Sequence, residues 1–206
     1  MSKIKGWVAA IILGLSSAAQ ATVLLQDDFD HETAGGTVDN YRGFSNFSVV
    51  RGSVDLVRSS PPLNCMGGQG FCVDMDGTSR YGGTLQSNTL FTLQAGTYNL
   101  SFSASGNQRT RGYDTLIASV GSVFSQSISL AFNAPHNIYD FTFSVLAPTT
   151  GYLSFSNTGN DNEGVILDNI LFSFNNNNNN TVPEPASLAL FGLGLGGMLL
   201  KRRRKA

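Results

Sequence analysis

Short runs in which apolar and polar residues alternate restrict the middle of this chain to β structure. The run at 97–105 is typical, because Tyr98, Leu100 and Phe102 fall on one side of an extended chain and polar residues fall on the other. Similar runs recur later in the sequence, at residues 140–146, 151–157 and 164–174. No stretch of this region has a convincing helical period, so we expect an all-β domain.

Turn signals containing glycine separate the runs. They lie at residues 76–78, 81–83, 95–97 and 147–151. Short strands divided by frequent turns are typical of antiparallel sandwiches. The prediction is an antiparallel β-sandwich of jelly-roll type, preferred over an immunoglobulin-like sandwich. Its expected span, residues 22–174, is long enough for one domain with a sizeable core.

Charged residues are distributed unevenly along the 206 residues. Lysine and arginine number 13 and aspartate and glutamate 14. Residues 22–181 nevertheless hold six arginines, no lysine and 13 acidic residues, a net charge of −7. This acidic middle argues against nucleic-acid binding, which depends on basic side chains that neutralise phosphates. The other basic residues lie at the two ends of the chain.

The first 21 residues have the pattern of a secretory signal peptide. A basic start, MSKIK, precedes the apolar GWVAAIILGL and the small-residue site AQA. We predict cleavage after Ala21. The alternative is an uncleaved anchor or a buried helix, but the apolar stretch is short for a membrane span.

The last 25 residues, 182–206, contain a second membrane signal. Residues 186–200 carry no charge and KRRRK follows them. As a helix this segment spans about 22 Å at 1.5 Å per residue, less than the roughly 30 Å hydrocarbon core of a bilayer. We predict a marginal transmembrane helix with its basic end in the cytoplasm. An Asn-rich linker at 175–181 separates it from the domain.

This end of the chain resembles a known sorting signal. The sequence Val182-Pro183-Glu184-Pro185, the apolar segment and the basic end are similar to the PEP-CTERM signal of Gram-negative bacteria. The resemblance implies that Pro183, Glu184 and Pro185 are recognised by an exosortase, a membrane protease-transpeptidase that passes the protein to the envelope or an extracellular polysaccharide matrix. Two prolines keep such a site extended. The alternative is an ordinary single-span anchor with the same topology.

Two cysteines, Cys65 and Cys72, lie seven residues apart in a glycine-rich segment. Export favours a disulfide between them. A zinc site needs more than two thiols.

The sequence contains no recognisable catalytic motif. His31 and His136 are its only histidines and match no zinc-hydrolase spacing, and no G-x-S-x-G motif occurs. We therefore predict no catalytic residue and no enzyme activity. A glycan-active enzyme stays an alternative, because carboxylates such as Asp74 and Asp76 could act as a pair if they faced a cleft.

Calcium is the best chemical hypothesis for the polar clusters of the domain, because Ca²⁺ prefers oxygen ligands from Asp, Asn and backbone carbonyls. The clusters are residues 26–30, 73–77 and 159–169. The alternative is that Asp74, Asp76, Asp161 and Asn162 only form Asx turns at the ends of strands.

Asp168 interrupts the apolar run VILDNILF, so it needs an edge position, polar neighbours or a cation. Residues 72–109 and 153–172 resemble ectodomains that precede PEP-CTERM signals and, more loosely, carbohydrate-binding jelly rolls. In those jelly rolls an aspartate of the final strand helps to hold a structural calcium with residues of the first strand. The resemblance implies a calcium held by Asp168 with Asp28 or Asp30.

Sugar recognition needs exposed aromatic rings with polar neighbours. Tyr81 and Tyr113 lie in loops that contain Gly and Arg, and Arg109 suits an acidic polysaccharide. We predict these three as ligand-binding residues. The alternatives are that the tyrosines cap the core and that Arg109 pairs with Asp114.

Together these features predict an exported, exosortase-processed protein of the cell envelope or extracellular matrix. It passes through the inner membrane in transit, and its non-catalytic domain binds extracellular polysaccharide. The expected partners are an exosortase, the membrane through the C-terminal helix, and a polysaccharide, with calcium as the one cofactor considered. A purely structural surface protein without a ligand is the main alternative.

Overall fold

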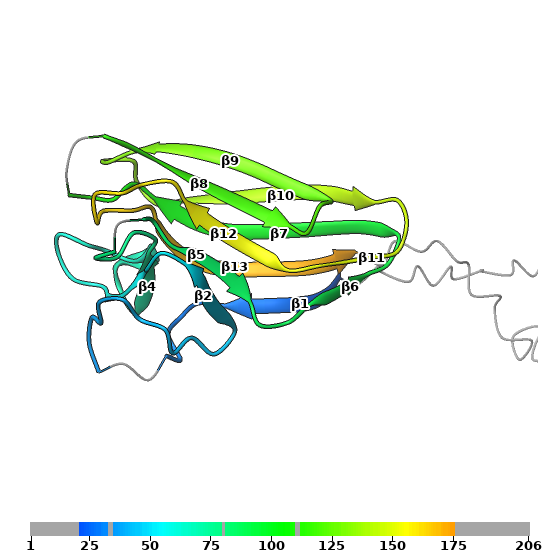
Figure 1. Cartoon of the computed structure of the whole chain (residues 1–206), viewed down its shortest axis with the longest axis horizontal. Coiled ribbons are helices and arrows are strands. Elements are labelled where there is room, and N and C mark those ends of the chain that lie inside the picture. Colours follow the sequence, from blue (N-terminus) through cyan, green and yellow to red (C-terminus); the bar gives the residue numbers. More distant parts are fainter. Residues whose placement is uncertain (1–20, 33–34, 80, 110–111, 176–206) are drawn as a thin grey trace, which may run out of the picture.

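The computed structural model describes residues 21–32, 35–79, 81–109 and 112–175 (Figure 1). The predicted signal peptide up to residue 20, the predicted membrane helix and the sorting motif lie outside these ranges. Across the ranges that are described, no helix combines the length and apolar character needed to cross a membrane.

The described residues form β-strands and one short turn of 3-10 helix. In chain order these are β1 (Ala21–Asp27), β2 (Phe47–Arg51), β3 (Asp55–Arg58), η1 (Met66–Gly68), β4 (Phe71–Asp74), β5 (Thr84–Ser87), β6 (Phe91–Leu93), β7 (Gly96–Ser105), β8 (Tyr113–Val120), β9 (Phe124–Ala131), β10 (Asn137–Val145), β11 (Thr149–Gly151), β12 (Leu153–Asn157) and β13 (Ile166–Asn175).

The strands form two antiparallel sheets that lie face to face (Figure 1). The first sheet has six strands in the order β10-β7-β13-β4-β3, and β1 pairs with β13 beside β4. The second sheet has five strands in the order β2-β5-β12-β8-β9. β6 and β11 form a separate two-stranded ribbon.

The chain crosses repeatedly between the two sheets. β7 belongs to the first sheet, β8 and β9 to the second, β10 to the first, β12 to the second and β13 to the first. This connectivity confirms the predicted antiparallel sandwich of jelly-roll type. The alternating runs at 97–105, 140–146 and 164–174 become β7, β10 and β13. β13 also includes Asn175, which the sequence interpretation assigned to the linker.

Side chains from the facing sides of both sheets form one hydrophobic core. Tyr98, Leu100 and Phe102 of β7 point into it and are at most 2% exposed, as the alternation predicts. Phe102 meets Phe155 of β12 edge-to-face, with ring centroids 5.1 Å apart. This contact joins the two sheets through the core.

A β-bulge in β13 explains how a charged residue fits into an apolar strand. The register of β13 against β7 shifts between Asp168 and Leu171, and Asn169 has a φ of +50°. Leu167 before the bulge and Ile170 after it both join the main core. Because the bulge adds one residue, the side chains on both sides of it face the core. Asp168 lies on the opposite face of the sheet from Leu167.

The predicted disulfide between Cys65 and Cys72 is present, with the two Cα atoms 5.4 Å apart. Its loop covers the outer side of the first sheet, where both half-cystines pack with Val57 and Ile166 in a small apolar cluster. The loop also covers Asp168, which accepts a hydrogen bond from its backbone. In the chain-entropy model, closing so short a loop contributes about 2.5 kcal/mol to stability.

The described chain begins and ends at the same end of the sandwich. Ala21 pairs with Asn175, the last residue of β13. At the other end of β13, Ile166 pairs with Ser105 and Asp74. Ten extended residues separate these ends by about 30 Å. We call the end marked by Asp74, Ser105 and Ile166 the loop end; it lies on the left in Figure 1.

Candidate functional site

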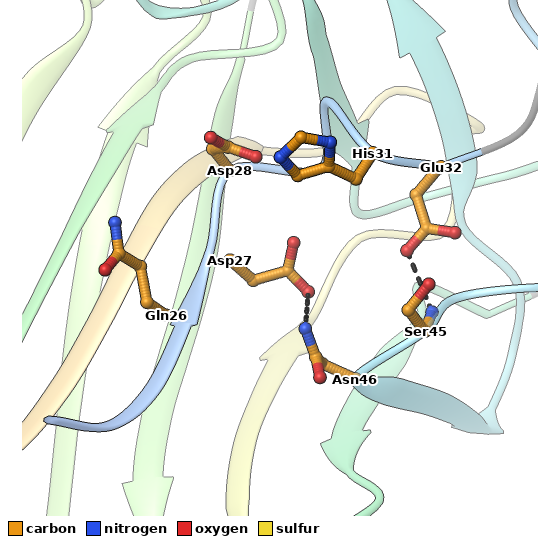
Figure 2. A pocket seen from close by; sticks show the side chains of 7 residues that line it. All are labelled: Gln26, Asp27, Asp28, His31, Glu32, Ser45 and Asn46. Carbon is orange, nitrogen blue, oxygen red and sulfur yellow. Dashed lines mark hydrogen bonds between the residues drawn. The ribbon is translucent and has the colours of Figure 1, made fainter.

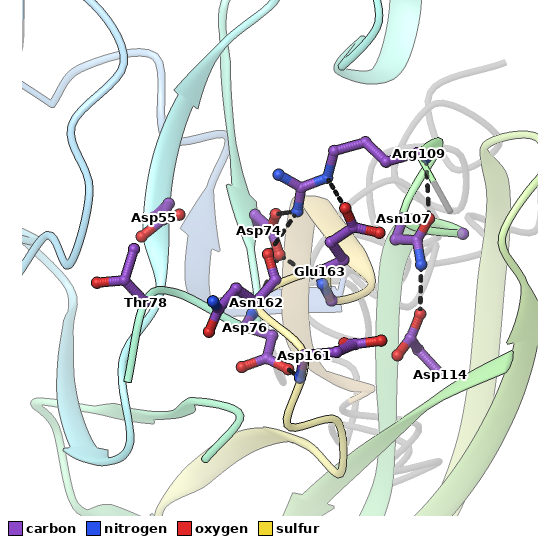
Figure 3. Close-up of polar contacts among 12 residues, drawn as sticks. Asp55, Asp74, Asp76, Thr78, Asn107, Arg109, Asp114, Asp161, Asn162 and Glu163 are labelled. Carbon is purple, nitrogen blue, oxygen red and sulfur yellow. Dashed lines mark hydrogen bonds and ion pairs between the residues drawn. The ribbon is translucent and has the colours of Figure 1, made fainter. Parts of the chain in front are cut away.

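Six carboxylates gather around one arginine at the loop end (Figure 3). They come from strand ends and from the loops that follow them. The residues are Asp55, Asp74, Asp76, Asp114, Asp161 and Glu163, and the arginine is Arg109. Like charges brought this close disfavour one another unless they are protonated, paired or bound to a cation.

Arg109 ties three segments of the loop end together. Its Nη2 donates to Asp74 Oδ2 and, at 2.9 Å, to the carbonyl of Asn162. Its Nε lies 3.7 Å from Glu163 Oε1. The pairing with Asp114 that the sequence left open does not form, because the carboxylate partners of the guanidinium are Asp74 and Glu163. The positive charge of Arg109 is therefore balanced by carboxylates of the domain itself.

Asp74 is completely buried, and both of its oxygens are hydrogen bonded. Oδ1 accepts from the backbone N–H of Asp76 at 3.1 Å and of Gly164 at 2.8 Å, and Oδ2 accepts from Arg109. The bond to Asp76 is the Asx turn expected from the sequence. Burial raises the pKa of Asp74 to about 7, although Arg109 and the two N–H groups act in the opposite direction.

Asp76 is also completely buried, but one of its oxygens has no partner. Oδ2 accepts from the backbone N–H of Asp161 at 3.3 Å, whereas Oδ1 accepts no hydrogen bond. Burial is the main reason that the pKa of Asp76 is raised to about 6, and the charges of Asp161 and Asp114 raise it further.

Asp114, near the start of β8, is held by a neighbouring amide. Its Oδ2 accepts from Asn107 Nδ2 at 3.0 Å, and Asn107 Oδ1 accepts from the backbone N–H of Arg109 at 2.9 Å. Burial raises the pKa of Asp114, while the hydrogen bond from Asn107 lowers it. The side chain is therefore fixed in place beside the other acids.

Three polar side chains converge closely beside Gly159. A β-carbon at this position would be 2.6 Å from Asp76 Oδ2, 2.7 Å from Asn157 Nδ2 and 3.3 Å from Asp114 Oδ1. Asn157 ends β12, is 1% exposed, and has no hydrogen-bond partner for either polar atom of its side chain. We call this cluster of Asp76, Asp114 and Asn157 the Gly159 cradle. The sequence placed Asp76 and Gly159 in two separate candidate calcium clusters, but it did not point to Asp114 or Asn157, because the residues come from three separate segments.

Tyr81 and Tyr113 lie at the same edge of the second sheet. Ser156 of β12 pairs with Thr84 of β5 on one side and with Ile117 of β8 on the other. Tyr81 precedes Thr84 by three residues and Tyr113 precedes Ile117 by four. The backbones of the two tyrosines therefore flank the end of β12, about two strand spacings or roughly 10 Å apart. Tyr81 is 49% exposed and Tyr113 78%.

Asp168 lies with Asp28 and Asp30 on the other side of the loop end. Asp168 is 3% exposed; its Oδ2 accepts from the N–H of Met66 at 2.9 Å and its Oδ1 from that of Asn169 at 2.7 Å. Burial raises the pKa of Asp168 to about 7, with smaller contributions from the charges of Asp30 and Asp28. The three predicted calcium ligands are thus close enough to interact electrostatically.

These carboxylates are already engaged with the backbone. Asp28 Oδ1 accepts from the N–H of Asp30, and Asp30 Oδ1 accepts from that of Phe71. Among the described residues, no group of three or more His, Cys, Asp or Glu side chains is arranged to hold a metal ion. The calcium set of Asp28, Asp30 and Asp168 therefore stays a prediction from the resemblance.

A shallow hollow of about 200 Å³ lies beside the end of β1 (Figure 2). Its lining is polar, and its two buried acids are hydrogen bonded: Asp27 accepts from Asn46 at 3.1 Å and Glu32 from the N–H of Ser45 at 2.8 Å. The volume is below the range usual for small-molecule sites. We assign no ligand to this hollow.

The comparisons with known proteins identify the C-terminal segment. Residues 181–205 match the family described as the PEP-CTERM protein-sorting motif. The chain therefore carries this motif, with Pro183, Glu184 and Pro185 inside the matched range. The motif indicates an exported protein that an exosortase processes at the envelope or extracellular side. No curated protein matches the chain in sequence.

Solved structures resemble the sandwich only at low similarity. The CBM22-1 xylan-binding domain of Paenibacillus barcinonensis Xyn10C has a TM-score of 0.45 and 10% identity, over 77% of this chain and 98% of that one. A family 35 carbohydrate-binding module from Clostridium thermocellum has a TM-score of 0.42 and 15% identity, over 68% and 99%.

An arabinose-bound α-L-arabinofuranosidase has a TM-score of 0.47 and 7% identity over 66% of this chain. The match spans about a quarter of that enzyme, 24% of its length. At these TM-scores the likenesses assign neither a ligand nor a binding residue to this chain.

Proposed function

We propose that this protein is an exosortase-processed surface or matrix protein whose sandwich binds extracellular polysaccharide at its loop end without catalysing a reaction. The observation that carries the proposal is the pair of exposed rings, Tyr81 and Tyr113, on either side of the end of β12. Tyrosine offers a sugar an apolar ring face and a polar tip in one side chain. With their backbones roughly 10 Å apart, the two tyrosines are within reach of one chain of linked sugars.

A cationic side chain beside Tyr81 suits an acidic polysaccharide. The guanidinium carbon of Arg51 lies 5.2 Å from the centre of the Tyr81 ring, a cation–π arrangement. Arg51 is exposed, whereas Arg109 is paired with Asp74. Arg51 thus replaces Arg109 as the proposed contact for a carboxylated or sulfated sugar.

The placement of the loop end supports a role at the cell surface. The described chain leaves the sandwich at Asn175, about 30 Å along β13 from the loop end, and the sorting motif follows at 181–205. A domain attached through this end presents Tyr81 and Tyr113 away from its attachment point.

Burial of Asp74 and Asp76 supports a non-catalytic role. Glycoside hydrolysis needs two carboxyl groups that reach the bond from opposite sides. Asp74 and Asp76 are both completely buried, and Asp74 is closed off by Arg109 and two backbone N–H groups. A glycosidic bond does not reach either group in this conformation.

Polysaccharide binding by tyrosine variants of the full-length protein tests the proposal. We expect Tyr81→Ala and Tyr113→Ala each to weaken binding to acidic extracellular polysaccharide at least tenfold, measured by affinity electrophoresis or calorimetry. Tyr152→Ala is the matched control: Tyr152 is 38% exposed and lies next to β11, away from the loop end, so binding should not change. Equal binding by the double variant would contradict the proposal. Absence of binding to any polysaccharide would favour the purely structural alternative.

A further inference from the structure

We propose that the Gly159 cradle binds one divalent cation, best matched by Ca²⁺, through the carboxylates of Asp76 and Asp114 and the amide oxygen of Asn157. The site is separate from the predicted calcium set of Asp28, Asp30 and Asp168, with which it shares no residue.

Unmet hydrogen-bonding capacity in the cradle is the first reason. Asp76 is completely buried and its Oδ1 has no partner, and Asn157 is 1% exposed with neither end of its amide engaged. Buried polar groups are nearly always partnered, because an unpartnered group has given up its hydrogen bonds to water without replacement. A cation coordinated by Asp76 Oδ1 and the amide oxygen of Asn157 gives both of these oxygens a partner. Rotation of the Asn157 side chain by half a turn presents its oxygen instead of its nitrogen to the cradle.

The geometry of the cradle is the second reason. One polar atom of each residue, Asp76 Oδ2, Asp114 Oδ1 and Asn157 Nδ2, lies within 3.3 Å of the point where a β-carbon of residue 159 would stand, so no two of these atoms are more than about 6 Å apart. Ca²⁺ binds oxygens at about 2.3–2.6 Å and accepts irregular sets of six to eight ligands completed by carbonyls or water. Small shifts of the three side chains bring them to these distances. Mg²⁺ demands a near-ideal octahedron, which a mixed set from three loops matches less well.

The charge balance of the cradle is the third reason. The two ion pairs of the described residues join Arg109 to Asp74 and Glu163. Within that part of the chain, Asp76 and Asp114 have no ion-pair partner, and the charge of Asp161 acts on both. A divalent cation neutralises the two carboxylates that coordinate it. The cradle has two acidic side chains and one amide, so it differs from a metal site built of three or more His, Cys, Asp or Glu side chains.

A cation in the cradle would join the segments that carry the exposed tyrosines. Asp114 directly follows Tyr113, and the N–H of Gly82, next to Tyr81, donates to the carbonyl of Gly159 at 3.0 Å. The cation would therefore fix both rings relative to the end of β12. The inference itself does not depend on polysaccharide binding, because its test measures the cation directly.

Calorimetric titration of the purified full-length protein with CaCl₂ after chelation tests the site. The key variant is Gly159→Ala, because its methyl group would come within 2.7 Å of Asp76 Oδ2 and Asn157 Nδ2 and displace these side chains. The matched control is Gly36→Ala, since a β-carbon there meets nothing within 4 Å. Asp76→Asn is a second variant that removes a ligand without adding bulk. Asp168→Asn reports on the other predicted site.

We expect the wild type, Gly36→Ala and Asp168→Asn to bind Ca²⁺ at the cradle with similar affinity. Gly159→Ala and Asp76→Asn should weaken that binding at least tenfold and abolish the matching calcium-dependent rise in melting temperature. Calcium binding that survives both cradle variants, or is lost only in Asp168→Asn, would overturn the inference. So would the absence of any calcium binding by the wild type.

Discussion

Asp168 and Asp76 are both buried carboxylates at the loop end, but they differ in how their oxygens are satisfied. Each oxygen of Asp168 accepts a backbone hydrogen bond, one from Met66 in the disulfide loop and one from Asn169 in the bulge. Asp76 has one oxygen bonded to the N–H of Asp161 and one without a partner. Neither side chain forms an ion pair within the described residues.

The difference separates a structural carboxylate from a candidate binding group. Asp168 holds the disulfide loop against the sheet, and each of its oxygens already accepts a backbone hydrogen bond. Asp76 lies among other acids with an oxygen and a neighbouring amide, that of Asn157, left unused. Natural domains keep few such groups, and those that remain are often explained by an ion or water.

The largest effect is expected from Asp168→Asn. An amide has only one oxygen, so its NH₂ group must face the N–H of either Met66 or Asn169, donor against donor. With the loss of charge-assisted bonds, we expect a destabilisation of about 3 kcal/mol. Urea unfolding of the disulfide-bonded protein in chelator at pH 8, above the pKa of Asp168, measures it. Asp140→Asn on the exposed side of β10 is the control and should change stability by less than about 0.5 kcal/mol. Equal stability of the two variants would mean that Asp168 does not hold the loop.

The sequence was sufficient for the features that depend on local pattern. The alternation of Tyr98, Leu100 and Phe102 predicted both the strand β7 and the side that faces the core. The spacing of Cys65 and Cys72 in an exported chain predicted the disulfide. These features need only neighbouring residues and the period of an extended chain.

The Gly159 cradle could not be predicted in the same way. Asp76, Asp114 and Asn157 lie about 40 residues apart in the chain and meet only after β4, β8 and β12 are placed in two sheets. The sequence assigned Asp76 either to a calcium site or to an Asx turn; the Asx bond that forms is that of Asp74, and Asp76 accepts instead from the N–H of Asp161. Nothing in the sequence indicated that side chains crowd Gly159, because that depends on segments distant in the chain.

A smaller effect is expected from pH, and its sign is opposite to ordinary acid denaturation. Burial raises the pKa of Asp74 and Asp168 to about 7 and that of Asp76 to about 6, from 3.8. Between pH 4 and 7 the folded protein therefore holds protons that the unfolded chain has lost, so stability falls as pH rises through this window. His136 has the opposite effect. Burial lowers its pKa below 6.5, so its contribution to folding stability is lost as pH falls.

The carboxyl groups outnumber the histidine, so we expect the chelated protein to be more stable at pH 5 than at pH 8. The difference should be at least about 1.4 kcal/mol, which corresponds to one pKa unit. Unfolding in urea at the two pH values measures it, and Ca²⁺ at pH 8 should recover part of the loss. A stability that rises from pH 5 to pH 8 in chelator would show that these buried carboxyls do not retain their protons.

The smallest effect, with reversed sign, is expected from Asp76→Asn. The amide oxygen still accepts from the N–H of Asp161, while the substitution removes a buried negative charge beside Asp114. In chelator at pH 8 we expect a stabilisation of about 1 kcal/mol, since one unpartnered charged oxygen disappears. The same change of side chain thus lowers stability at residue 168 and raises it at residue 76.

Addition of calcium should reverse the order of wild type and Asp76→Asn. Wild type gains stability by binding the ion, whereas the variant has lost a ligand and gains little. Urea unfolding of both proteins with chelator and with Ca²⁺ gives the four free energies that this requires. Asp168→Asn is expected to be destabilising in chelator. If Asp76→Asn were destabilising there too, Asp76 would also be a structural carboxylate. The contrast between the two acids would then not hold.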